Sequence, residues 1–338
     1  MRRRFKKYFN PFSVTEEISL RFHWMVSKIM QGKNLRFLEK YQAMPVQTRP
    51  IFIIGPPRCG STLLYQALVQ QFKFSYFQNR MVKHKYSICV YTEKHIDPLK
   101  EYISDFWNRQ GKTRFPNGPN EGSFFWRRFY PRNVHDYIEK QLLSPLQVFE
   151  IINTIKFLEN YFQAPFLSKN LEMGLRLKSI QQLFPGAIFI IMKRDPRGIA
   201  SSLLSSRIAV NGKKEVWWSI RPREYERLLQ RPYHEQIAYQ IIKIYQAIYK
   251  DFNPQLGTKI ELFYEDLCEN PTESLTYLQN KIGNSHVSLE RKQSKLQDKF
   301  SLKTQFNFSE KELTDITELF VKERLVEQVP FRMDKIKL

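Results

Sequence analysis

The most regular stretch of the chain begins at residue 51, where four apolar residues follow one another. A continuous apolar run such as 51–54 predicts a short strand buried on both faces, as in a parallel sheet. Residues 55–60, with two glycines and two prolines, end this strand. Beyond Ser61 the apolar positions fall on one face of a helix: Leu63, Leu64, Ala67 and Leu68. The pattern therefore predicts a unit of strand, glycine loop and helix.

A second unit of this kind begins at residue 187. Residues 187–192 form another apolar run, residues 193–198 (KRDPRG) form a polar loop, and a helix is expected to begin near Ile199. Residues 261–267 (ELFYEDL) predict a strand that ends in a polar turn, and Pro271 opens the helix behind it. Two more apolar stretches predict helices, at residues 146–162 and 235–252.

This alternation of strands and helices predicts an α/β fold. We expect a P-loop-like three-layer arrangement, a central parallel sheet flanked by helices, with functional sites at the carboxyl ends of the strands. The chain divides into a basic, aromatic N-terminal arm (1–48) and a single domain (49–338). Within that domain, residues 74–135 are less regular and include an exposed loop at 116–122. The last seventy residues predict helix and loop without a further strand.

The charge of the chain indicates an anionic partner. Lysine and arginine outnumber the acidic residues 54 to 33, which gives a formal charge of +21 over 338 residues. Because 42% of the residues are apolar and 14% aromatic, this is a folded protein and not a disordered basic tail. Nucleic acid, a phosphorylated cofactor, an acidic glycan or a membrane surface would each fit.

The arm concentrates this charge, with eleven basic and three acidic residues in the first 49. It predicts either a segment packed on the body or a peripheral contact with anionic lipid headgroups. No apolar run approaches the roughly 18 residues of a membrane span, and the basic start lacks the apolar core of a secretory signal. Cys59, Cys89 and Cys268 lie far apart and form neither a disulfide framework nor a metal cluster. We therefore expect a cytoplasmic protein without a metal.

The glycine loop has the frame of a nucleoside-triphosphate loop but not its lysine. In GPPRCGST, Ser61 stands where that loop carries the lysine that reaches the β- and γ-phosphates. The backbone N–H groups of Gly60, Ser61 and Thr62 would still point at an anion, and the two hydroxyls add donors. The loop thus predicts a phosphate-like ligand without the magnesium–triphosphate apparatus, or else a plain turn.

The second unit gathers further anion-binding groups: Arg194, Arg197, Ser201, Ser202 and Ser205. Arg194 and Ser202 are eight residues apart, so that a strand-end arginine and a hydroxyl two turns into the helix could hold one phosphate. The alternative is a helix capped by Asp195 with arginines on the surface. Two anion sites on two units suit a ligand with two separated anionic groups.

These segments resemble the sulfotransferase family. IFIIGPPRCGSTLLYQAL is similar to the 5′-phosphosulfate loop of that family, and FIIMKRDPRGIASSLLSSR to its 3′-phosphate motif. PFLSKNLEMGLRLKSIQQLFPGA and YEDLCENPTESLTYLQNKIG resemble the segments that precede and follow that motif. The resemblance implies transfer of a sulfuryl group from 3′-phosphoadenosine-5′-phosphosulfate (PAPS) to a hydroxyl or amine, with 3′,5′-adenosine bisphosphate (PAP) as product and no metal.

The resemblance also implies roles for single residues. Arg58 would neutralise the leaving phosphate, and the 5′ group would bind to a continuous stretch of the loop: Cys59, Gly60, Ser61, Thr62 and Leu63. Arg194 and Ser202 would hold the 3′-phosphate, and Tyr264 would lie near the adenine, although a strand aromatic fits that position as well. For Arg197 both a place at the 3′-phosphate and a solvent-facing position after Pro196 stay open.

For the catalytic base, the resemblance points to Glu121 in FPNGPNEGSFFWRRF, although a loop carboxylate paired with Arg127 or Arg128 is the alternative. Many relatives use a histidine, and the candidates in this region are His84, His95 and His135. Lys169 matches a lysine that relatives present to the sulfate; otherwise it is a solvated lysine at a strand end.

The acceptor is not evident from the sequence. A glycan, lipid headgroup, small molecule or peptide fits, and the basic stretch 74–164 favours an anionic or sugar-like one. The rival functions are a P-loop-like nucleotide kinase, a nucleic-acid-binding protein without catalysis, and a sulfotransferase-like protein that has lost its chemistry. Nucleic acid is not among the partners we expect.

Overall fold

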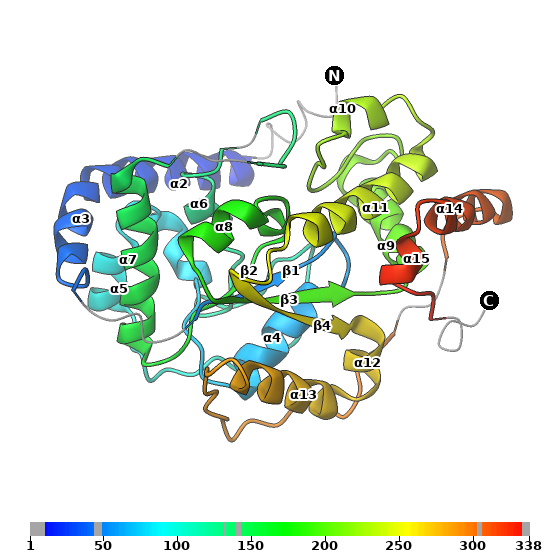
Figure 1. Cartoon of the computed structure of the whole chain (residues 1–338). Helices are drawn as coiled ribbons and strands as arrows, with labels where there is room; N and C mark the ends of the chain where they lie inside the picture. Colours follow the sequence, from blue (N-terminus) through cyan, green and yellow to red (C-terminus); the bar gives the residue numbers. More distant parts are fainter. Residues whose placement is uncertain (1–10, 44–48, 132, 140–142, 303–305, 333–338) are drawn as a thin grey trace.

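The protein is built around a four-stranded, all-parallel sheet in the strand order β2-β1-β3-β4 (Figure 1). The computed structural model describes residues 11–43, 49–131, 133–139, 143–302 and 306–332. The strands are β1 (Ile51–Ile54), β2 (Leu167–Lys169), β3 (Ala187–Lys193) and β4 (Gly257–Phe263). The predicted α/β class and central parallel sheet are confirmed.

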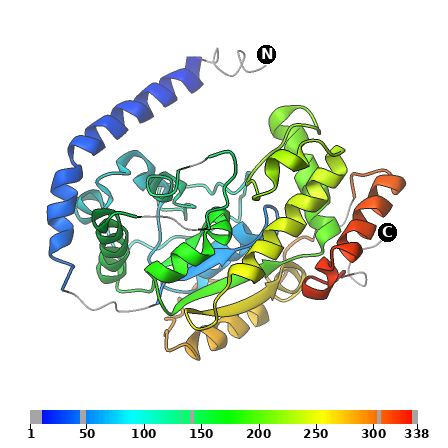
Figure 2. The ribbon, with the colours of Figure 1, turned by 45° about the horizontal axis from the view of Figure 1, so that its top comes forward.

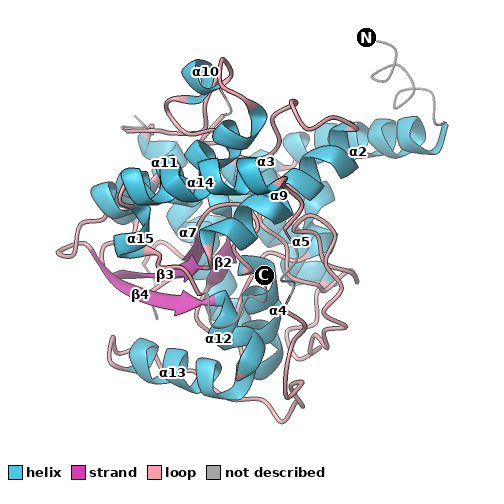
Figure 3. Ribbon diagram, turned by 90° about the vertical axis from the view of Figure 1, so that its right-hand side faces the viewer, coloured by secondary structure: helices cyan, strands magenta, loops and turns pink. Residues whose placement is uncertain are grey.

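The central strands are apolar because both of their faces are covered. Every residue of β1 and β3 is buried, and the two strands pair in register from Ile51 with Ile188 to Ile54 with Ile191. On one side of the sheet lie α4, α12 and α13; on the other lie α8, α9 and α11 (Figures 1 and 3). Because the strands are parallel, their carboxyl ends all lie at the same edge of the sheet.

The helices include the four predicted from residues 61, 146, 235 and 271, each of which begins within two residues of that position. They are α2 (Pro11–Ile29), α3 (Gln31–Glu39), α4 (Ser61–Gln71), α5 (Ile88–His95), α6 (Ser123–Trp126), α7 (Pro145–Phe162), α8 (Leu177–Leu183), α9 (Pro196–Asn211), α10 (Tyr225–Leu228), α11 (Tyr233–Asp251), α12 (Tyr264–Glu269), α13 (Pro271–Gly283), α14 (Glu310–Lys322) and α15 (Leu325–Gln328), with 3₁₀ turns η1 (Asn79–His84) and η2 (Leu171–Leu175). Helix α9 starts three residues earlier than expected, because the Asp195 side chain accepts a hydrogen bond from the Arg197 N–H and caps it. No helix in the described part of the chain is long and apolar enough to cross a membrane.

Two strands differ from the expectation. The strand predicted at 261–267 is displaced: β4 pairs with β3 from Gly257 to Phe263, and Tyr264 already belongs to α12. β4 is the edge strand, and its half-buried alternation is a weaker signal than a continuous apolar run. For strand β2, only three residues long, the sequence predicts only a strand end at Lys169, without bounds.

The N-terminal arm is helical where the structure describes it. Helix α3 packs its buried residues Phe37 and Leu38 into the core of the domain, against α5 and α7. Helix α2 instead projects along the outside of the body (Figure 2). The most basic part of the arm, residues 1–10, lies outside the described residues.

Candidate functional site

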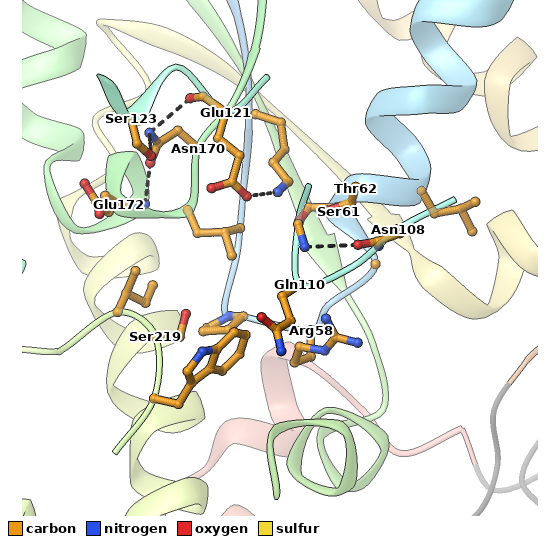
Figure 4. A pocket seen from close by; sticks show the side chains of 18 of the residues that line it. Arg58, Ser61, Thr62, Asn108, Gln110, Glu121, Ser123, Asn170, Glu172 and Ser219 are labelled. Atoms are coloured by element: carbon orange, nitrogen blue, oxygen red, sulfur yellow. Dashed lines mark hydrogen bonds and ion pairs between the residues drawn. The ribbon is translucent and has the colours of Figure 1, made fainter. Parts of the chain in front are cut away.

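A cavity of about 230 Å³ lies at the carboxyl ends of β1, β2 and β3. Its walls come from the glycine loop, the ends of β2 and β3, and three irregular segments of the chain. Figure 4 shows its side chains pointing inward from opposite walls. The lining residues are Pro57, Arg58, Gly60, Ser61, Thr62, Leu63, Asn108, Gln110, Gly111, Glu121, Ser123, Arg127, Lys169, Asn170, Leu171, Glu172, Arg194, Trp218, Ser219, Ile220 and Tyr264.

The glycine loop turns sharply between β1 and α4. Arg58 and Gly60 both have positive φ angles, 71° and 95°. A Cβ on Gly60 would lie 2.2 Å from Cδ2 of Tyr264, so only glycine lets this ring close over the loop. The Cys59 side chain is fully buried and points away from the cavity, toward Gly55, and burial raises the pKa of its thiol.

The first turn of α4 faces the cavity with its backbone donors. Gly60 is the N-cap and supplies no side-chain cap, and Ser61 and Thr62 follow it at the cavity wall. Both hydroxyl-bearing residues are buried. The unpaired N–H groups of a helix start and the helix dipole favour a negative charge in front of them.

Two arginines meet beside this helix start. Arg194, directly after β3, donates from Nη1 to the carbonyl oxygen of Arg58 at 2.9 Å. The Nε of Arg58 donates to Oγ of Ser202 at 2.9 Å. Arg58 thus contacts both Arg194 and Ser202, the two residues that are predicted to hold the 3′-phosphate. The guanidinium of Arg194 stacks on the Tyr264 ring, 4.5 Å from its centroid.

The electrostatics of this corner favour an anion. Burial, and then the neighbouring charge of Arg194, lower the pKa of Arg58. Among the described residues, no carboxylate forms an ion pair with Arg58. Arg194 is buried and Arg58 half-buried, so their like charges repel each other. An anionic ligand between them would relieve that repulsion.

Of the two positions left open for Arg197, the solvent-facing one is not observed. Arg197 is buried, its Nη2 lies 2.6 Å from Oδ2 of Asp195, and its guanidinium stacks on Phe331. Asp195 also accepts the backbone N–H of Arg332 at 2.9 Å, so this pair ties the C-terminal segment to the start of α9.

The three serines predicted near this loop also differ in their hydrogen-bond partners. Ser201 accepts the backbone N–H of Asn307 at 3.0 Å, and Oγ of Ser205 accepts from Nδ2 of Asn307 at 2.7 Å. Ser202 instead accepts a hydrogen bond from Nε of Arg58, an arginine of the cavity. One face of α9 therefore serves the cavity and another anchors the C-terminal segment.

Glu121 and Lys169 form an ion pair in the opposite wall of the cavity. Lys169, at the end of β2, is 1% exposed and so is not a solvated lysine, whereas the Glu121 side chain is 34% exposed and reaches the cavity (Figure 4). Nδ2 of Asn170 donates to the Glu121 carbonyl oxygen at 3.1 Å and fixes the loop. The backbone of Gly111 covers the pair, since a Cβ there would lie 2.6 Å from Oε1 of Glu121.

The alternative partners of Glu121 are engaged elsewhere. Arg127 pairs with Glu172, with 2.5 Å between Nη2 and Oε1. Arg128 pairs with Glu150, with 2.7 Å between Nη2 and Oε1. The pairing of Glu121 with either arginine is therefore not observed.

The candidate histidines are not among the residues that line the cavity. The His84 ring stacks on Tyr91 with 3.7 Å between centroids, and burial lowers the pKa of His84 to about 4. The His95 ring also contacts Tyr91, with 5.0 Å between centroids. Nδ1 of His135 is buried without a hydrogen-bond partner among the described residues. Of the candidate bases, only Glu121 faces the cavity.

Sequence reasoning missed one wall of the cavity, the loop Trp218–Ser219–Ile220. Ser219 has φ 76°, a left-handed conformation that is strained for serine. Nε2 of Gln240 holds the loop by donating to the carbonyl oxygens of Trp218 and Ile220, at 3.1 and 2.8 Å. This wall has no local motif, and only tertiary packing brings it to the cavity.

A buried arginine lies behind that loop. Arg207 is 0% exposed and donates to the amide oxygens of Gln236, at 3.0 Å, and Gln240, at 3.5 Å. Burial lowers the pKa of Arg207 to about 10. Burying a cation among neutral amides is costly. Gln240 connects Arg207 to the cavity wall, since it also holds Trp218 and Ile220.

The fold and the site can be compared with known proteins. The model of the sulfotransferase family matches residues 50–286, more than half of the chain. Among solved structures, the sulfotransferase STF9 from Mycobacterium avium is similar at 14% identity with a TM-score of 0.54, covering 90% of this chain and 82% of that one. The sulfotransferase STF1 from Mycobacterium tuberculosis H37Rv is similar at 12% identity with a TM-score of 0.50, covering 90% and 80%. No curated protein shows significant similarity to the chain.

Proposed function

The chain belongs to the sulfotransferase family, and on that premise we propose that it transfers the sulfuryl group of PAPS to a hydroxyl of its acceptor. The observation that carries the proposal is the arrangement of charges around one cavity. Arg58 and Arg194 meet at one end beside the first turn of α4, and the Glu121–Lys169 pair lies in the opposite wall. Cations for a leaving phosphate and a carboxylate for an incoming hydroxyl thus face a shared space.

We assign the donor to the arginine side of the cavity. The N–H groups from Gly60 to Leu63 and the Ser61 and Thr62 hydroxyls would bind the 5′-phosphosulfate. Arg194 and Ser202 would hold the 3′-phosphate by charge-assisted hydrogen bonds. Tyr264 supplies an aromatic face on which the adenine could stack. Cys59 would contribute only its backbone, because its thiol points into the core.

The chemistry is an in-line transfer between two oxygens. The acceptor hydroxyl gives its proton to the Glu121 carboxylate while its oxygen forms a bond to sulfur. The bond between sulfur and the phosphate oxygen breaks, and the negative charge that builds on that oxygen is stabilised by Arg58. Lys169 orients Glu121 through their ion pair and offers a positive charge to the sulfuryl oxygens. The rate enhancement comes from positioning of the reactants and from electrostatic stabilisation of the transition state, as in phosphoryl transfer.

We further propose that the acceptor carries several hydroxyl groups, as a sugar does. The acceptor side of the cavity is lined by side-chain amides and a hydroxyl, from Asn108, Gln110, Asn170 and Ser123. Trp218 adds an aromatic surface to the same cavity. Amides and hydroxyls that both donate and accept hydrogen bonds suit a polyol better than an apolar phenol. We also propose a cytoplasmic location, which the three separate, buried free cysteines support.

Calorimetric titration with PAP tests the proposal, without metal and beside ATP with magnesium. We expect PAP to bind at about micromolar Kd, at least tenfold more tightly than ATP with magnesium, and Arg194→Ala to weaken PAP at least about tenfold. Lys281→Ala, which removes an exposed cation of α13 outside the cavity lining, is the control and should bind PAP unchanged. Folded protein that binds ATP with magnesium but not PAP would replace the sulfotransferase proposal with a kinase.

A further inference from the structure

Helix α2 carries an apolar stripe on the side that faces away from the body. The stripe, defined here as the outer stripe, consists of Ile18, Phe22, Met25, Val26 and Ile29, which are 43–76% exposed. Their spacing places them on one face of the helix. Single exposed apolar residues are common on protein surfaces. A continuous apolar stripe on one helix instead marks a surface that binds a protein or a membrane.

The opposite face of α2 holds the helix on the body through polar contacts. Nε1 of Trp24 donates to the carbonyl oxygen of Val82 at 2.9 Å. Oγ of Ser27 lies 3.1 Å from Oγ of Ser87 and accepts the backbone N–H of Tyr86 at 3.0 Å. None of the outer-stripe residues takes part in these contacts. Figures 2 and 3 both show the start of α2 projecting away from the rest of the chain.

The charge of the same segment identifies the kind of partner. Residues 1–28 contain seven lysines and arginines against two glutamates. Within α2, Arg21 and Lys28 flank the stripe and are exposed. A helix with an apolar stripe, flanking basic residues and a strongly basic neighbouring segment suits the interface of an anionic bilayer, where it lies in the plane of the headgroups.

A second copy of the chain fits the outer stripe less well. A symmetric dimer would bring the stripes of two copies together, and with them the two basic segments. Like charges at close range oppose that pairing, whereas anionic lipids are attracted by the same charges.

We propose that the outer stripe of α2 docks the protein onto anionic lipid membranes. The apolar side chains enter the region between headgroups and acyl chains, and the basic residues contact the anionic headgroups. This surface lies apart from the cavity, so the proposal stands independently of the sulfotransferase function.

Co-sedimentation of the full chain with lipid vesicles tests the proposal. We expect binding to vesicles of phosphatidylglycerol mixed with phosphatidylcholine, weaker binding as salt is raised, and little binding to phosphatidylcholine alone. The double variant Phe22→Ser/Met25→Ser should weaken binding at least about tenfold, because it removes two apolar anchors. Arg21→Gln/Lys28→Gln should weaken it several-fold, and at low salt only.

The matched control is Leu146→Ser/Val321→Ser, which removes two apolar side chains of similar exposure (57% and 53%) from other helices. It should bind vesicles as the unsubstituted protein does, and thermal unfolding and light scattering verify that every variant is folded and of unchanged mass. The proposal would be overturned if the folded protein did not bind anionic vesicles at low salt. It would also be overturned if Phe22→Ser/Met25→Ser bound them as tightly as the unsubstituted protein. If the unsubstituted protein were a dimer and Phe22→Ser/Met25→Ser made it a monomer, the outer stripe would bind a second copy of the chain instead.

Discussion

The two halves of the cavity are built in different ways. The donor half, the side that we propose binds the nucleotide, comes from two continuous stretches, 55–62 and 193–202, each of which runs from the end of a central strand into a helix. The acceptor half, the side that we propose binds the acceptor, comes from separate segments, 108–111, 121–127, 169–172 and 218–220, most of them irregular. Anion binding needs only a strand end, a glycine and a helix start, which one short stretch of chain can supply. Recognition of an acceptor needs side chains from several directions, which only the tertiary fold supplies.

This difference predicts that the halves can be damaged separately. Substitutions in the donor half should change nucleotide affinity, whereas substitutions in the acceptor half should change turnover or acceptor KM and leave nucleotide affinity intact.

Glu121→Gln should lower kcat about 10³-fold, because the amide cannot take the proton of the acceptor. PAP affinity should remain unchanged in the same variant, which separates a lost base from a damaged donor site. Steady-state kinetics with an identified acceptor, together with PAP titration, measure both quantities. Glu101→Gln, at an exposed carboxylate outside the cavity, is the control and should keep full turnover. A Glu121→Gln variant with unchanged kcat would remove this residue from the chemistry.

Gly60→Ala should damage the donor half most selectively. The added Cβ would meet the Tyr264 ring and sit at a φ of 95°, so the ring must move. We expect the free energy of unfolding to fall by about 2 kcal/mol and PAP affinity to fall at least about tenfold. Denaturant unfolding and PAP titration measure the two effects.

The control for that substitution is Gly283→Ala at the end of α13, where an added Cβ has nothing within 4 Å. This variant should leave PAP affinity unchanged and the stability within about 0.5 kcal/mol. If Gly60→Ala behaved like Gly283→Ala, the close contact between the glycine loop and Tyr264 would have no role in binding.

Arg207→Met should weaken binding of the acceptor and leave binding of the nucleotide unchanged. Its hydrogen bonds to Gln236 and Gln240 support the amide that holds Trp218 and Ile220 at the cavity. We expect the acceptor KM to rise about threefold to tenfold, with PAP affinity and kcat little changed. Equal losses in PAP affinity and acceptor KM would show that Arg207 supports the whole fold and not this wall.

His84→Gln should alter acid stability and leave turnover intact. The pKa of His84 lies near 4 in the folded protein and about 6.5 when unfolded, so the unfolded chain takes up the proton first as the pH falls. His84 therefore lowers stability between pH 6.5 and 4, by only about 1 kcal/mol since the ring is half-exposed. Urea unfolding at pH 7 and pH 5 should show a smaller loss for His84→Gln. Loss of turnover would instead return His84 to the candidate bases.

The donor half and the central strands could be predicted from the sequence because their signals are local. GPPRCGST and KRDPRG each directly follow an apolar strand and lead into a helix, so that strand end, turn and helix start lie within about a dozen residues. Even here single side chains escaped prediction. Arg197 lies three residues from Arg194 yet turns to Asp195, since its orientation depends on the C-terminal segment that packs there.

The acceptor half could be predicted only in part. Glu121 was found by resemblance, but its pairing with Lys169 joins residues 48 positions apart, and no local pattern encodes it. The loop at 218–220 depends on Gln240 and Arg207, which read in the sequence as ordinary residues of two helices. The start of β4 was misplaced for a related reason, because the register of an edge strand is fixed by its partner, β3.

The most direct test compares PAP binding by Arg194→Ala and Glu121→Gln in parallel with the unsubstituted protein. The separation of the two halves predicts that Arg194→Ala loses at least about tenfold in affinity while Glu121→Gln binds as tightly as the unsubstituted protein. Equal losses in both folded variants, or none in either, would contradict a cavity in which the nucleotide is held by the arginine side alone.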